Sequence, residues 1–227
     1  MHFWPATQDG YHLDVPASLD LIEQSRPNLA ILGKSLFLFP EPVSQIGEVC
    51  SELKIPLLYD GAHVLGLILG GCFQDPFREG AHFINASTHK TFPGPQRGVI
   101  LGNLESEEEL RWWRSVDRGV MPGSSSSHHL HTLPGLLIAI REMKVHGKSY
   151  ASQIIVSAKA FGSTLNTEKT DVEAGDLVLL KATSWPCVSA VSAVQRKSPA
   201  SLLNRISSAT TTSFREIPTH DTHQVCA

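Results

Sequence analysis

The sequence has no apolar run long enough to cross a membrane. Spanning the hydrocarbon core takes about 20 consecutive apolar residues, whereas the longest runs here, at 30–32 and 64–69, are strand-sized or short. Residues 1–10 also lack the basic segment followed by an apolar stretch that begins a secretory signal. These absences predict a cytoplasmic protein with no membrane partner.

An excess of positive charge is also missing. The 227 residues include 19 basic and 22 acidic side chains, which gives a formal net charge of −3. A protein that binds nucleic acid through its phosphates needs a clustered basic face. We therefore expect no nucleic-acid partner.

Cysteine pairs and metal-ligand spacings are scarce. The sequence contains no CxxC, which favours small buried cysteine side chains over a disulfide framework. Histidines gather at 128–131 and 220–223, but neither cluster has a cysteine or carboxylate at zinc-ligand spacing, so we expect no metal site. The cysteines are Cys50, Cys72, Cys187 and Cys226.

Short apolar runs alternate with helical patterns along residues 28–165. A continuous apolar run that ends in glycine or a polar residue is typical of a buried parallel strand. The alternation predicts an α/β fold with a mainly parallel sheet. The expected strands are 28–33, 54–60, 82–88 and 98–101, and the expected helices are 41–53, one that begins after residue 106, 129–146 and 150–165.

Two of these helices carry more specific predictions. Ser106 and Glu109 have the spacing of a capping box, and the helix that follows places Leu110, Trp113 and Val116 on its inner face. In the 129–146 helix, the apolar residues at 130, 133, 136, 137 and 140 are expected to face the core.

The pattern changes after residue 165. Only 176–181 is typical of a strand, 207–213 is rich in serine and threonine, and the apolar residues beyond 197 show little period. We therefore divide the chain into a large domain at 1–165 and a segment at 166–227, which is either a weak, incomplete second unit or partly disordered.

Three predicted strand ends carry polar side chains. Ser35 follows the first strand, Asp60 and His63 follow the second, and residues 87–90 end the third. Because the carboxyl ends of parallel strands meet at one edge, a carboxylate, an imidazole, hydroxyls and the Lys90 amine should converge. This set suits pyridoxal phosphate (PLP), which needs an amine for a Schiff base and a carboxylate to keep its ring nitrogen protonated. Taken singly, Lys90 is more typical of a surface position and Asp60 of a turn at a strand end, and His63 is compatible with a core position.

Two stretches at these strand ends resemble one enzyme family. Residues 59–67 read YDGAHVLGL and residues 87–95 read STHKTFPGP, which is similar to the core of serine hydroxymethyltransferase and its close relatives. The similarity extends more loosely over 14–165 and includes 32–37 and 121–131. It implies PLP fold type I, the aspartate-aminotransferase class, here with an incomplete large domain and a poorly matched partial small domain.

The resemblance implies cofactor-binding roles for the matching residues. Lys90 matches the lysine that binds PLP covalently, and Asp60 matches the acid that faces the pyridine nitrogen. His63 matches a residue close to the PLP hydroxyl group, and Ser35 matches a serine that hydrogen-bonds the same oxygen.

The loop around this lysine holds further candidates. His89 matches a histidine that influences substrate choice, and Ser87 keeps a hydroxyl where the family usually has threonine. Gln96 stands where many members have arginine, with Arg97 one place later, so the sequence departs from the family at this contact.

The match begins in the middle of the family's large domain. A truncated member would lack the loop for the PLP phosphate and the residues that stack on the ring and transfer protons. In the second unit, 219–225 faintly resembles a small-domain segment. Arg205 and Arg215 are candidates, by charge alone, for binding a substrate carboxylate.

Three functions are compatible with these residues. The first is a glycine hydroxymethyltransferase that interconverts serine and glycine, with tetrahydrofolate as the one-carbon acceptor. The second is a PLP-dependent threonine aldolase or transaldolase of β-hydroxy-α-amino acids. The third is a catalytically inactive fragment. The resemblance also implies an amino-acid substrate and pairing, as a homodimer or with a full-length subunit.

Overall fold

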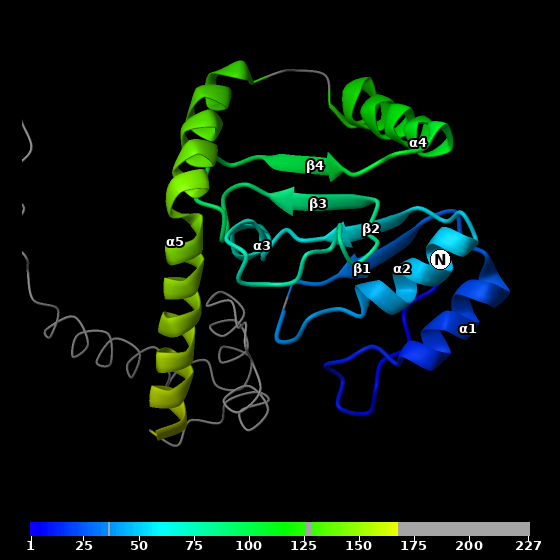
Figure 1. Cartoon of the computed structure of the whole chain (residues 1–227), viewed down its shortest axis with the longest axis horizontal. Coiled ribbons are helices and arrows are strands. Elements are labelled where there is room, and N and C mark those ends of the chain that lie inside the picture. The colour runs from blue at the N-terminus through cyan, green and yellow to red at the C-terminus, as the bar shows by residue number, and fades with distance from the viewer. Residues whose placement is uncertain (36, 126–128, 168–227) are drawn as a thin grey trace, which may run out of the picture.

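A computed structural model describes residues 1–35, 37–125 and 129–167 (Figure 1). Strands and helices alternate as far as β3, and a long helix ends the described part. The elements are α1 (Val15–Ser25), β1 (Ala30–Gly33), α2 (Val43–Glu52), β2 (Leu57–Asp60), α3 (Leu65–Leu69), β3 (Phe83–Ser87), β4 (Gly98–Gly102), α4 (Glu107–Arg118), η1 (Gly119–Ser124), η2 (Leu130–Thr132) and α5 (Leu133–Thr167).

The four strands form one sheet in the order β1-β2-β3-β4. The first three are parallel, and β4 runs antiparallel to β3. Gly33, Asp60 and Asn85 are register partners across the first three strands. All four predicted strands and the mainly parallel sheet are therefore confirmed. The carboxyl ends of β1, β2 and β3 point toward α5 (Figure 1).

The two faces of the sheet are covered unequally. Leu57 and Tyr59 are fully buried in the core that also contains α2, while Leu58 on the alternate face is half-buried and Ile31 is 47% exposed. A groove of about 470 Å³ lies between this second face and α4. Parallel sheets are usually covered on both faces, so this face is incompletely packed in the described part.

Helix α1 was not predicted, although its signals are present. The Asp14 side chain accepts a hydrogen bond from the Ala17 amide, and Pro16 follows in the first turn. Helix α3, which forms from residues 65–69 of the apolar run at 64–69, was not predicted either. Because such a short run fits either element, its periodicity could not decide between them.

Helix α4 begins as predicted and packs less fully than predicted. Ser106 and Glu109 form the capping box. Trp113 stacks on Phe83, with ring centroids 6.2 Å apart, but is still 38% exposed. Leu110 is 39% exposed, so the expected inner face is only partly covered.

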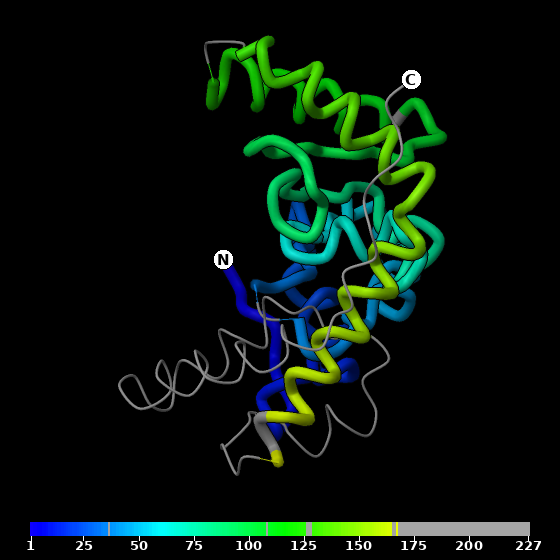
Figure 2. The backbone as a smooth tube through the Cα atoms, turned by 90° about the vertical axis from the view of Figure 1, so that its left-hand side faces the viewer, coloured from blue at the N-terminus to red at the C-terminus, as the bar shows by residue number. Residues whose placement is uncertain are grey.

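Helix α5 corrects two predictions. Where two helices were expected, at 129–146 and 150–165, residues 133–167 form one continuous helix that runs along the described part of the chain (Figure 2). Most of the stripe expected to face the core is exposed, at positions 130, 133, 137 and 140. The buried residues in the described part of α5 are Ala139, Met143, Gly147, Ala151, Ala158 and Gly162.

Small residues explain which face of α5 turns inward. A side chain on Gly70, at the end of α3, would lie 2.4 Å from the Ala151 Cβ and 2.6 Å from the Gly147 oxygen. The two backbones therefore approach closely where glycine and alanine meet. A pattern based on leucine and isoleucine could not identify this contact.

The structure describes two of the four cysteines. Cys50 is buried and free, and burial raises the pKa of its thiol to about 11, whereas Cys72 is half-buried and free. Several other predictions lie outside the described residues. They are the strand at 176–181, the two candidate arginines, Cys187, Cys226 and the histidines at 220–223. Within the described ranges, no helix is both long and apolar enough to cross a bilayer.

His82 links β2 to β3 through its side chain. Its Nδ1 accepts a hydrogen bond from the Leu57 amide at 3.1 Å, and its ring packs edge-on against Trp112. Burial lowers the pKa of His82 below its ordinary value of 6.5, and the charge of Glu109 opposes this shift. The folded chain therefore favours the neutral imidazole.

We expect acid to destabilise the fold through His82. The folded-state pKa of His82 lies below 6.5, so its full contribution to stability is present above that pH. As the pH is lowered, the unfolded chain binds the proton before the folded chain does, and the free energy of unfolding falls. The free energy of urea unfolding should be larger at about pH 7.5 than at about pH 5.5. In His82→Asn, whose Oδ1 can accept the Leu57 amide, this difference should shrink; equal pH slopes in the two proteins would contradict the prediction.

Candidate active site

The carboxyl ends of β1 and β2 are held together at a glycine. Gly33 has φ +118°, and a side chain there would lie 2.4 Å from the Asp60 carbonyl oxygen. Only glycine tolerates both the conformation and the contact. Asp60, half-buried, accepts a hydrogen bond from the Ala62 amide at 3.0 Å, which turns the chain toward α3.

The loop between β3 and β4 is closed by Thr88. Its hydroxyl donates to the Pro95 oxygen at 2.5 Å, and its amide donates to the Arg97 oxygen at 3.0 Å. The Gly94 amide returns a hydrogen bond to the Thr88 oxygen at 2.7 Å. The loop is thus compact, and Lys90 lies half-buried within it.

Thr91 fastens this loop to α3. Its buried hydroxyl donates to the His63 oxygen at 2.7 Å and accepts the Gly66 amide at 3.2 Å. A side chain on Gly66 would lie 2.1 Å from the Thr91 oxygen. The absence of a side chain at this position lets the two segments touch backbone to backbone.

This contact brings Lys90 next to His63. The Lys90 Nζ lies 3.1 Å from the His63 Nε2. A protonated lysine can only donate, so Nε2 accepts and the imidazole proton is assigned to Nδ1. That Nδ1 is buried and has no hydrogen-bond partner among the described residues.

The electrostatic environment keeps this imidazole neutral. Burial is the main cause that lowers the pKa of His63, and the charge of Lys90 adds to it, while the charge of Asp60 opposes both. The site therefore holds a cation, a neutral imidazole with an unused donor, and a carboxylate. A buried donor without a partner is costly, so the arrangement fits a bound group that offers an acceptor atom.

The six predicted site residues are only partly brought together. Lys90 and His63 are in contact, and Asp60 is close enough to affect the charge of His63. Ser87 ends β3 half-buried, whereas Ser35 and His89 are exposed. Among the described residues, none of these last three has a side-chain hydrogen bond to the Lys90–His63 pair. Their roles stay predictions.

Arg97 connects two segments of the site, a role that the sequence did not predict. Its Nε donates to the Thr132 hydroxyl at 2.7 Å, and its terminal nitrogen donates to the His129 oxygen. These bonds connect the Lys90 loop to the segment that begins α5. The departure of Gln96 and Arg97 from the family pattern was the available signal.

A mainly parallel sheet with a lysine, a histidine and an aspartate near its carboxyl edge is the arrangement found in PLP fold type I enzymes, the class of the structural neighbour given below. Residues 6–180 match the family model described as serine hydroxymethyltransferase. The chain belongs to this family, which confirms the resemblance found in the sequence.

Two relatives are similar to this chain in sequence, and one solved structure is similar to it in fold. The chain is 45% identical over 171 residues to serine hydroxymethyltransferase of Methanocella arvoryzae, a match that covers 75% of this chain and 39% of the relative. It is 46% identical over 164 residues to that of Pyrobaculum islandicum, covering 72% and 37%. The crystal structure of L-threonine transaldolase from Pseudomonas fluorescens is similar with a TM-score of 0.70 and 29% identity, over 78% of this chain and 39% of that one. The chain thus spans about two fifths of the length of these proteins.

The contact between Gly66 and Thr91 yields a stability prediction. Gly66→Ala places a Cβ against backbone atoms that cannot rotate away, so we expect the free energy of unfolding to fall by about 3 kcal/mol. Urea titration followed by circular dichroism would measure this change.

Gly119→Ala is the matched control. Its new Cβ would have nothing within 4 Å, and its backbone is already right-handed helical. It should be neutral or should stabilise by up to about 1 kcal/mol. Equal losses in the two variants would show that the close approach at Gly66 is not what costs stability.

Proposed function

We propose that the chain carries the cofactor centre of a PLP-dependent glycine hydroxymethyltransferase, which interconverts serine and glycine with tetrahydrofolate as one-carbon acceptor. The observation that carries this proposal is the 3.1 Å contact between Lys90 and a neutral His63 in a loop that belongs to this family. The relatives named serine hydroxymethyltransferase support the same assignment.

The residues present fit PLP at this place. When bound, PLP supplies an electron sink for breaking bonds at the amino-acid α-carbon. Lys90 would be its covalent attachment point, and Asp60 would hold a proton on the ring nitrogen through a charge-assisted hydrogen bond. The unused Nδ1 proton of His63 offers a donor for an oxygen of the bound group.

The remaining predicted residues act, in this proposal, around that centre. Ser35 would hydrogen-bond the same oxygen as His63, Ser87 would supply a hydroxyl at the end of β3, and His89 would face the amino-acid substrate. The partner is a free amino acid, the compartment is the cytoplasm, and the assembly is a homodimer or a pair with a full-length subunit.

A transaldolase or aldolase of β-hydroxy-α-amino acids is the second candidate. The similarity to L-threonine transaldolase, with a TM-score of 0.70, favours it. Lys90 and Asp60 would serve both reactions, so these residues do not separate them. Strict dependence on tetrahydrofolate would support the first candidate, and release of aldehyde without folate would support the second.

Attachment of PLP tests the proposal directly. We expect the full chain incubated with PLP and then reduced with borohydride to carry the label on Lys90, located by peptide mapping. Lys90→Ala should lose the label, whereas Lys159→Ala, which removes an exposed lysine of α5, should keep it. Labelling of the wild type at other lysines only would refute the assignment of Lys90.

Asp60→Asn tests the second cofactor contact. The amide cannot hold the ring nitrogen in its protonated form, so turnover should fall by orders of magnitude while labelling of Lys90 persists. Serine cleavage with and without tetrahydrofolate would be the assay. Unchanged turnover would remove Asp60 from the site.

A further inference from the structure

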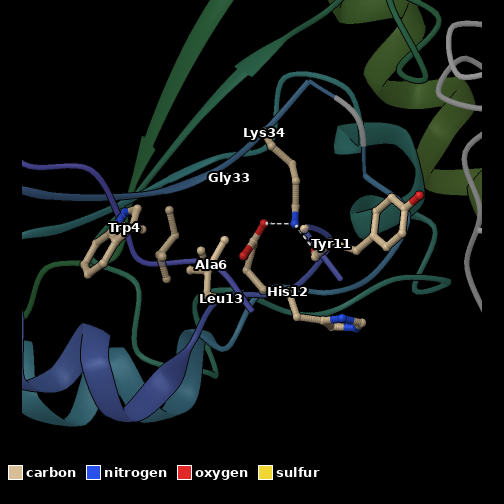
Figure 3. A pocket seen from close by; sticks show the side chains of 10 residues that line it. Trp4, Ala6, Tyr11, His12, Leu13, Gly33 and Lys34 are labelled. Carbon is tan, nitrogen blue, oxygen red and sulfur yellow. Dashed lines mark hydrogen bonds and ion pairs between the residues drawn. The ribbon is translucent and has the colours of Figure 1, made fainter. Parts of the chain in front are cut away.

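A partly buried ion pair connects the two ends of the loop that follows β1. Lys34 extends from the end of the strand into a pocket of about 190 Å³ beside Trp4 and Leu13 (Figure 3). Its Nζ lies 2.8 Å from the Glu41 Oε1 and donates to the Tyr11 oxygen at 3.1 Å. The Glu41 side chain is only 4% exposed. The pair therefore joins the two ends of residues 34–41.

Gln74 extends this link to β2. Its Nε2 donates to the main-chain oxygen of Glu41 at 3.0 Å, and its Oε1 accepts the main-chain amide of Glu41 at 2.9 Å. The same Oε1 accepts the Tyr59 hydroxyl at 2.9 Å. Burial, with the charges of Glu41 and Glu79 adding to it, raises the pKa of Tyr59 well above its usual range, so the hydroxyl stays a donor.

The network connects two strand ends of the candidate active site. Lys34 directly precedes Ser35, and Tyr59 directly precedes Asp60. Glu41 therefore lies between the loop that carries one predicted cofactor residue and the strand that carries the other. No other chain of side-chain hydrogen bonds in the described ranges joins these two places.

We propose that Glu41 is a positioning residue that sets the placement of Ser35 relative to Asp60. This inference rests on the proposed function for its consequence, but its geometric claim concerns only the chain's own residues. The physical cause is the cost of an unpaired charge. Without the carboxylate, the partly buried Lys34 ammonium loses its counter-charge and moves toward water, because a buried charge without a partner is strongly unfavourable. The base of the loop then opens.

Glu41→Gln isolates the charge, since the amide keeps the size of the side chain. In the full chain, hydrogen exchange should accelerate by about tenfold in both 34–41 and 60–62. Lys34 no longer holds residue 41, whose main chain is hydrogen-bonded through Gln74 to Tyr59, so the loosening reaches both strand ends. The dissociation constant for PLP, measured by absorbance titration under conditions where circular dichroism shows every variant folded, should rise by about tenfold. The double variant Lys34→Gln/Glu41→Gln, in which two amides can hydrogen-bond, should recover both values.

Asp75→Asn is the control, because it removes the same charge from an exposed pair with Arg78. It should leave exchange in both segments and the PLP dissociation constant unchanged. Exchange that stays constant in Glu41→Gln, or rises only in 34–41, would overturn the inference. So would faster exchange without loss of PLP affinity, which would reduce Glu41 to a purely structural role.

The two proposals fail in different ways. A wild-type chain that binds no PLP would refute the proposed function, and the exchange contrast between Glu41→Gln and Asp75→Asn would still decide whether Glu41 fixes both strand ends. A chain that binds PLP with equal affinity in both variants would refute the inference and leave the function standing.

Discussion

The site depends on one backbone contact, the approach of Gly66 to Thr91. Lys90 and His63 lie 27 residues apart on loops that follow different strands. The parallel sheet brings those loops to the same edge, but it does not bring their side chains within hydrogen-bond distance. The Thr91 hydroxyl does so by accepting the Gly66 amide and donating to the His63 oxygen. Because both bonds are to backbone atoms of residues 63–66, they hold that segment against Thr91, the residue after the lysine, rather than holding the lysine itself.

The local chemistry of the site follows from what this contact encloses. Lys90 and Asp60 carry opposite charges, and their effects on His63 oppose each other. Burial tips the balance toward the neutral imidazole, whose Nε2 then accepts from the lysine while its Nδ1 keeps a proton for another partner. A protonated imidazole could not accept from Lys90 and would add a second cation beside it. The neutrality of His63 is thus the condition for its contact with the lysine.

The sequence predicted the strands that carry this site better than the hydrogen bonds that hold its loops in place. Continuous apolar runs identified all four strands, and the rule that ligands bind at the carboxyl ends of parallel strands placed Lys90, Asp60 and His63 near one another. These hydrogen bonds were not predicted because Thr91, Arg97 and Glu41 act through backbone atoms or side chains distant in sequence, which leave no periodic pattern. The face of α5 was wrong for a related reason, since alanine and glycine allow a close approach that leucine would block.

The hydrogen bonds of Thr91, Arg97 and Glu41 hold the loops of the site without contacting the Lys90 nitrogen. Thr91 ties its loop to α3, Arg97 ties the same loop to the start of α5, and Glu41 ties the neighbouring loop to β2 through Gln74. Each uses a different partner element. Lys90 has only His63 as a side-chain partner in the described part of the chain. The hydrogen bonds therefore hold the backbone of the loops, while the Lys90 amine keeps a single side-chain contact. An amine needs this arrangement if it is to exchange a histidine contact for a covalent bond.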